Sequence, residues 1–262
     1  FIVDNKPGAG GVVGTDAAAK APADGYTLLV ADLGQVAINP ALSAKTPYDP
    51  VRDFAPITRL GTTPFFLAVN ASTGIASFSE WVTLVKAKPG QLSYGSSGNG
   101  SPHHLAMEML KSKLGLAIEH IPYKGSGQST PALLSGQVPM LFTVLPSVST
   151  YVKAGTVRLL AQASVTRSPQ APDVPTFAEL GVSDMAFLPM VAMLAPAGTP
   201  STIIQLLAGE LAKAVKHPES LQRFAALGID PMSETPDAYA TQLRADLAYY
   251  ARAVRISGAK SE

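Results

Sequence analysis

Apolar and polar positions alternate along this chain in short blocks, separated by turns rich in glycine and proline. Some apolar blocks have the length of a strand, and others repeat every three or four residues as a helix requires. Strands are expected at residues 1–3, 26–31, 117–121, 139–144 and 157–163, and helices at 12–21, 38–42, 130–135, 147–154, 201–216, 219–227 and 236–254. Strands that alternate with helices indicate an α/β protein with mostly parallel sheets.

Two apolar stretches, at residues 58–69 and 187–195, are long for single strands and stand at roughly symmetric positions. We interpret them as crossings between two α/β lobes, the second lobe being an insertion in the first. Lobe 1 would comprise residues 1–63 and 192–262, and lobe 2 residues 64–191. A single doubly wound sheet would give a similar pattern. In either arrangement ligands bind at the carboxyl ends of strands, where loops meet helix N-termini.

The most informative segment is a glycine- and serine-rich loop that leads into a helix. Ser101 and Pro102 are typical of a helix N-cap and first helical position, and Gly115 is placed to end that helix. Free amides at a helix N-terminus, together with the partial positive charge there, favour an anion. The expected anion contacts are Ser96, Ser97, Gly98, Asn99, Gly100 and Ser101. The alternative is a tight loop with an ordinary cap.

Composition narrows the class of protein. The 262 residues are 47% hydrophobic and 15% charged, and 20 basic against 19 acidic residues form no basic stripe, so no nucleic-acid partner is expected. No apolar run approaches the roughly 20 residues that span a bilayer, which favours a soluble protein. The chain has no cysteine, which excludes disulfides and thiolate chemistry and suits an oxidising compartment. The four histidines form no ligand-spaced pair, so neither a metal nor a cofactor is expected.

The sequence does not match the catalytic and cofactor-binding motifs that its glycine-rich loops suggest. After Gly8 and Gly10 the third glycine of a dinucleotide fingerprint is replaced by Val13. The serines at 96 and 97 lack the spacing of a nucleophile elbow. His104 is expected at the helix surface or on a cleft wall rather than as a general base. A binding protein is therefore favoured over an enzyme, and a serine-dependent hydrolase using Ser96 or Ser97 stays open as the alternative.

An ordered series of short motifs covers the whole chain. It includes NKPGAGG at residues 5–11, PADGYTLL at 22–29, YGSSGNGS at 94–101 and APAGTP at 195–200. Further members are INPAL at 38–42, PYDP at 47–50, PYKG at 122–125, GQV at 136–138 and PDVPT at 172–176. In this order and spacing the series resembles the Bug family, the TctC-like extracytoplasmic solute-binding receptors of tripartite tricarboxylate transporters.

This resemblance implies a fold like that of type II periplasmic binding proteins, with a cleft between two α/β lobes. It further implies a periplasmic, monomeric receptor that closes on a small carboxylate and delivers it to permease subunits in the membrane. An extracytoplasmic sensor built on the same fold is the other alternative. In the inserted lobe, the expected ligand contacts are Ser96, Ser97, Gly98, Asn99, Gly100, Ser101, His104, Gly125, Ser126 and Thr143. Asp32, Gly34 and Gln35 are expected to approach from the first lobe.

The chain departs from the family pattern at three places. The family normally begins with a further strand and a Gly-Gly loop upstream, so part of lobe 1 is expected to be missing from this sequence. Thr143 stands where members often carry an aspartate, which argues against an ammonium-bearing ligand such as an amino acid. Met190 stands where a tryptophan is common in the family, so a more flexible side chain is expected in the wall of the ligand site.

Overall fold

Two β-sheets organise the chain in the computed structural model, which describes residues 2–260. Within these residues the first sheet has the strand order β1 (Leu29–Asp32), β8 (Met190–Pro196), β2 (Phe54–Thr62) and β9 (Asp230–Pro231). The second has the order β5 (Glu119–Pro122), β4 (Ser93–Ser96), β6 (Met140–Val144), β3 (Phe65–Asn70) and β7 (Val157–Gln162). All strands of the second sheet lie in sequence between β2 and β8, so the lobe it organises is inserted in the other.

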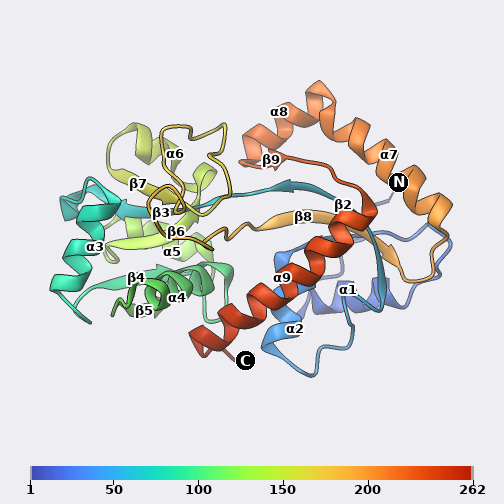
Figure 1. Cartoon of the computed structure of the whole chain (residues 1–262), viewed down its shortest axis with the longest axis horizontal. Coiled ribbons are helices and arrows are strands. Elements are labelled where there is room, and N and C mark those ends of the chain that lie inside the picture. The colour runs from blue at the N-terminus through green and yellow to red at the C-terminus, as the bar shows by residue number, and fades with distance from the viewer. Residues whose placement is uncertain (1, 261–262) are drawn as a thin grey trace.

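Helices surround both sheets (Figure 1). In the part of the chain described, the α-helices are α1 (Val12–Ala19), α2 (Asn39–Leu42), α3 (Phe78–Ala87), α4 (Pro102–Leu114), α5 (Ser126–Leu134), α6 (Leu145–Lys153), α7 (Ser201–Lys216), α8 (Pro218–Leu227) and α9 (Pro236–Ser257). There are also two short 3-10 helices, η1 (Ala9–Gly11) and η3 (Ala71–Thr73), and a five-residue π-helix, η2 (Gly34–Ile38). The paired strands β2 and β8 run from one lobe toward the other, and α9 crosses the molecule diagonally beside them (Figure 1). The expected α/β class with an inserted second lobe is confirmed.

Strand directions differ from the expected mostly parallel sheets, and that prediction was wrong. In the first sheet, β8 is antiparallel to β1 and β2, and β2 is antiparallel to β9. In the second, β4 is parallel to β5 and β6, but β3 is antiparallel to β6 and β7. The strand β3, which follows β2 after a two-residue link, runs against the direction of its neighbours β6 and β7 in the second sheet. The alternation of strands and helices along the sequence does not determine whether neighbouring strands are parallel or antiparallel.

The strand expected at residues 1–3 is also not found where the structure describes it. Phe1 lies outside the described residues, and Ile2 and Val3 are exposed and pair with no strand. Apolar character alone predicted this strand, and it fails because no sheet edge in residues 2–260 takes these residues as a partner.

Helix α9 packs on both lobes. Tyr239 and Leu243, in its first half, belong to the apolar core of the first sheet together with Leu194. Tyr250 and Val254, near its end, belong to the apolar cluster that fills the inserted lobe and also includes η2. One helix therefore contributes apolar contacts to each lobe.

An ion pair fixes the segment before α9 to the crossing strand β2. The guanidinium of Arg59 donates to both carboxylate oxygens of Glu234, at 2.5 and 2.9 Å, and the side chains are only 15% and 14% exposed. The Glu234 amide also donates to the Thr58 hydroxyl at 3.0 Å. Replacing one partner of such a pair by a neutral residue destabilises the protein, because the other charge remains buried without a partner.

Candidate functional site

The carboxyl ends of three neighbouring parallel strands bring most of the expected contacts together. In the register of the sheet, Gly95 of β4 lies beside Leu141 of β6, and Ser96 lies beside Pro122 of β5. The loop after β5 is bonded to the loop after β4, since the Gly125 amide donates to the Ser97 carbonyl at 3.1 Å. Thr143, two residues beyond Leu141, lies at the same edge.

Helix α4 begins and ends where the sequence predicts. The Ser101 hydroxyl accepts from the His104 amide at 3.3 Å, and Pro102 occupies the first turn. Gly115 ends the helix in the left-handed conformation, with φ of 63°. The N-terminus of α4, with its unpaired amides and partial positive charge, is thus directed at the loop 96–101.

Glycine is required at two positions of this loop. Gly98 has φ of 130° and Gly100 has φ of 70°, values that side-chain-bearing residues rarely adopt. A methyl group on Gly100 would lie 3.2 Å from both Cδ atoms of Leu42 in α2 and 3.6 Å from the Cβ atom of Ala259. The loop of the inserted lobe therefore packs directly against the first lobe and the end of the chain that follows α9.

Along the loop, amides that are hydrogen-bonded within the protein alternate with amides that are not. The Gly98 amide donates to Ser96 Oγ at 3.1 Å, and the Gly100 amide donates to His104 Nδ1 at 3.0 Å. Within residues 2–260, no hydrogen bond is donated by the amides of Ser97 or Asn99. The donors that the loop leaves for a ligand are thus the amides of Ser97 and Asn99, rather than those of the two glycines.

Three histidines line the inner side of this loop. His120 Nε2 is 2.7 Å from Ser96 Oγ, and His103 Nδ1 is 2.7 Å from Ser97 Oγ. The prediction that His104 lies at the surface or on a cleft wall was wrong. The residue is 4% exposed, and its ring accepts the Gly100 amide and stacks on His120 with the ring centroids 4.0 Å apart.

Burial keeps these histidines neutral. It lowers the pKa of His103 to about 4, and burial with the neighbouring His104 ring lowers the pKa of His120 to about 4. Burial also lowers the pKa of His104. Around neutral pH the loop is therefore supported by uncharged imidazoles, which accept and donate hydrogen bonds without adding net charge.

The two serine–histidine contacts lack the third group of a hydrolytic triad. Glu108, the carboxylate on the same helix, accepts from Tyr94 Oη and from Lys111 Nζ, each at 2.6 Å. Among the described residues, no carboxylate is hydrogen-bonded to His103 or His120. A general base without an orienting acid, with its pKa lowered to about 4, is poorly matched to activating a serine near neutral pH.

The three contacts expected from the first lobe, Asp32, Gly34 and Gln35, form a turn that is closed by hydrogen bonds among themselves. Asp32 Oδ1 accepts from the amides of Gly34 and Gln35, at 2.6 and 3.3 Å, and Gln35 Oε1 accepts the Asp32 amide at 2.7 Å. The adjoining η2 packs into the same apolar cluster as α4. Over residues 2–260, no hydrogen bond joins this turn to the loop 96–101.

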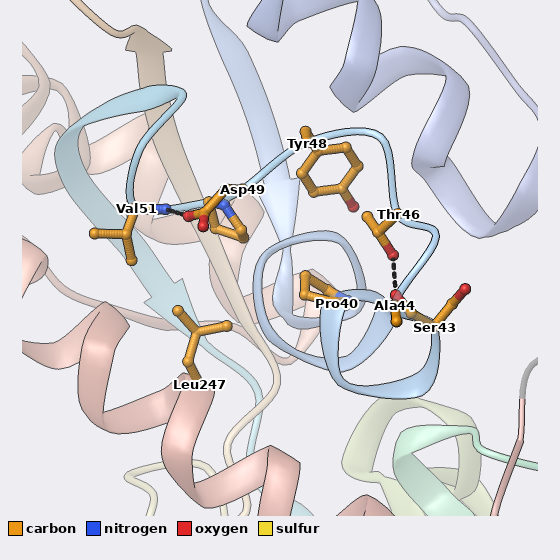
Figure 2. A pocket seen from close by; sticks show the side chains of 9 residues that line it. Pro40, Ser43, Ala44, Thr46, Tyr48, Asp49, Val51 and Leu247 are labelled. Atoms are coloured by element: carbon orange, nitrogen blue, oxygen red, sulfur yellow. Dashed lines mark hydrogen bonds between the residues drawn. The ribbon is translucent and has the colours of Figure 1, made fainter.

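Two surface pockets lie elsewhere. One of about 320 Å³ is on the first lobe, and the residues that line it include Pro40, Tyr48 and Leu247 of α9 (Figure 2). Another, with a volume of about 350 Å³, lies beside the crossing strands and includes Thr62 and Leu188. None of the expected ligand contacts lines either pocket.

Two further properties bear on the class of protein. Over residues 2–260, no helix combines the length and the apolar character that crossing a membrane would take. The same residues contain no group of three or more histidine, aspartate or glutamate side chains arranged to hold a metal ion.

A mixed α/β protein with an inserted lobe, paired crossing strands and an amide-rich loop at the lobe boundary has the architecture of the two-lobed solute-binding proteins. The sequence model of the tripartite tricarboxylate transporter family receptor, TctC, matches residues 1–255. The chain belongs to this family. The resemblance inferred from the motifs is confirmed.

Relatives and solved structures agree with this assignment. Protein BugT of Bordetella pertussis is 37% identical over 260 residues, which cover 99% of this chain and 80% of that protein. The structure of Rpa4515 of R. palustris with adipate is 30% identical, with a TM-score of 0.82 over 99% of this chain and 87% of that one. MatC from Rhodopseudomonas palustris with bound malate is 27% identical, with a TM-score of 0.75 over 94% of this chain and 85% of that one.

Proposed function

We propose that this chain is a periplasmic receptor that binds a small carboxylate and delivers it to the membrane permease of a tripartite tricarboxylate transporter. Membership of the receptor family supports a binding role without catalysis. The structures of two similar proteins, one with adipate and one with malate, support a dicarboxylate as the class of ligand. The single observation in this chain that carries the proposal is the pair of unbonded amides, Ser97 and Asn99, at the N-terminus of α4.

The ligand carboxylate is bound by these two amides and by the Ser101 hydroxyl, with Gly125, Ser126 and Thr143 at the same sheet edge. Each hydrogen bond from a neutral donor to a carboxylate contributes about 1.5–3 kcal/mol, and a few of them reach micromolar affinity after the cost of association. Because no side-chain cation is involved, the anion is held without an ion pair that would slow its release.

Lobe closure completes the site. The proposed boundaries, residues 1–63 with 192–262 and residues 64–191, fall in the link between β2 and β3 and at the beginning of β8. Rotation about these links moves Asp32, Gly34 and Gln35 toward the loop 96–101. A ligand that contacts both lobes only in the closed arrangement shifts the population toward it.

Calorimetric titration of the purified chain with dicarboxylates, tricarboxylates, aromatic acids and amino acids tests the proposal. We expect binding of adipate, malate or a related acid, and no binding of the amino acids of the panel, because Thr143 offers no carboxylate to their ammonium group. A chain that is folded by circular dichroism and yet binds no acid of the panel would contradict the proposed function.

A further inference from the structure

Beneath the loop 96–101 lies a column of three rings from three different elements. Tyr94 of β4 stacks on His120 of β5, with ring centroids 4.9 Å apart and 19° between the planes. His120 in turn stacks on His104 of α4, at 4.0 Å and 6°. The proposed ligand contacts do not use His120, and His104 faces inward, so a separate role is needed to explain the column.

Each histidine of the column is bonded to one point of the loop. His104 Nδ1 accepts the Gly100 amide at 3.0 Å. His120 Nε2 contacts Ser96 Oγ at 2.7 Å, and that hydroxyl accepts the Gly98 amide at 3.1 Å and reaches the Gly98 carbonyl at 3.0 Å. The two glycine amides are thereby bonded inside the protein, whereas the amides of Ser97 and Asn99, each of which precedes one of the glycines, are not.

We propose that His104 and His120 are positioning residues that hold the loop in the conformation in which the Ser97 and Asn99 amides bind the carboxylate. This inference rests on the proposed function. Neither ring touches the ligand. The two histidines act through Gly100 and Ser96.

The two histidines use different ring nitrogens, which allows a positional test. Nδ1 is bonded to Cγ, so the side-chain amide of asparagine places a polar atom at nearly the same point. Nε2 lies one bond further out, where the longer side chain of glutamine places its amide. His104→Asn and His120→Gln therefore preserve the bonding atom, whereas His104→Gln and His120→Asn misplace it while keeping the same chemical group.

We would measure the affinity of all four variants for adipate and malate by calorimetry, together with hydrogen exchange of the Gly98 and Gly100 amides in the free protein. His104→Asn and His120→Gln are expected to bind within about threefold of the wild type. His104→Gln and His120→Asn are expected to bind at least about tenfold more weakly, with faster exchange at Gly100 and Gly98 respectively. His217→Gln, at an exposed helix junction, is the matched control and is expected to change neither quantity.

Equal affinity of all four variants would overturn the positioning role, and so would unchanged exchange at both glycines. Either result would leave the carboxylate-binding function standing if the wild type binds an acid. If the wild type binds neither probe nor any acid of the wider panel, the proposed function fails. In that case the exchange measurement alone decides whether the histidines hold the loop, with faster exchange in the misplaced variants as the supporting result.

Discussion

At the residue scale, Gly100 combines a left-handed backbone with close contact to the opposite lobe. Alanine at this position is expected to destabilise the protein by about 1–2 kcal/mol and to weaken carboxylate binding, because the left-handed backbone is strained with a Cβ atom and the contact with Leu42 must shift. Gly115→Ala is the matched control. It has a similar φ of 63° but nothing within 4 Å of the added methyl group, so it should lose stability and keep binding. Thermal unfolding and calorimetric titration check both; unchanged affinity in Gly100→Ala would contradict the expectation.

The buried histidines make stability depend on pH in one direction. The pKa values of His103 and His120, about 4 in the folded protein, lie below the value of about 6.5 in an unfolded chain. Between those values the unfolded state binds more protons, so the free energy of unfolding falls as pH falls from about 6.5 toward 4. Urea unfolding at several pH values should show this slope, and a smaller slope in His120→Gln. A flat profile for the wild type would rule the effect out.

Residue-level prediction from the sequence succeeded where the cause is local. Ser101, Pro102 and Gly115 act on neighbouring backbone, and the helix begins and ends at them. His104 was placed wrongly because its partners are a glycine amide and the ring of His120, which belongs to another strand. His120 and His103 were missed as supports of the loop. Nothing in the spacing of His120 from Ser96 signals a contact that depends on the parallel pairing of β4 with β5.

At the element scale, Ser101 both caps α4 and faces the proposed ligand. Ser101→Ala is expected to cost about 1 kcal/mol of stability and to weaken binding. Ser101→Asp keeps a good cap, so its stability should match the wild type, but its carboxylate repels the ligand and binding should be lost. Chemical denaturation and titration separate the two effects. An aspartate variant that binds an acid normally would place the ligand elsewhere.

The ion pair between Arg59 and Glu234 anchors the segment before α9 to β2. Arg59→Met is expected to lower the free energy of unfolding by about 3 kcal/mol, because Glu234 keeps its charge with little access to water. Arg167→Met is the matched control. Its pair with Glu179 is 42% and 46% exposed and screened by water, so a much smaller loss of stability is expected. Equal losses in the two variants, measured by urea unfolding, would show that burial of the pair does not matter.

Elements were easier to predict than their directions. The strands β6 and β7 and the helices α7 and α9 lie close to the expected ranges, because periodicity and turn residues are local signals. The antiparallel direction of β3 depends on how the chain crosses between lobes. That property belongs to the topology of the whole chain, and a pattern of apolar residues does not encode it.

At the scale of the whole molecule, the proposed function requires the lobes to approach each other. The sequence contains no cysteine, so two introduced cysteines can be spin-labelled without background. Labels at Lys86 in α3 and Lys213 in α7, both exposed and on different lobes, should move closer when an acid of the panel binds. Pulsed electron–electron distance measurements check this, with ligand-free protein as the reference. An unchanged distance distribution at saturating ligand would contradict lobe closure.

Because α9 packs its first half on one lobe and its last turns on the other, any hinge movement must break or slide one of these two contacts. The free-energy difference between the open and closed arrangements of the lobes therefore depends partly on side chains such as Tyr250 and Val254, which are buried and are not among the proposed ligand contacts. Substitutions there can retune how tightly the protein holds its cargo while the recognition surface stays the same. Selection on ligand affinity can therefore also act on helix α9, outside the residues that bind the ligand.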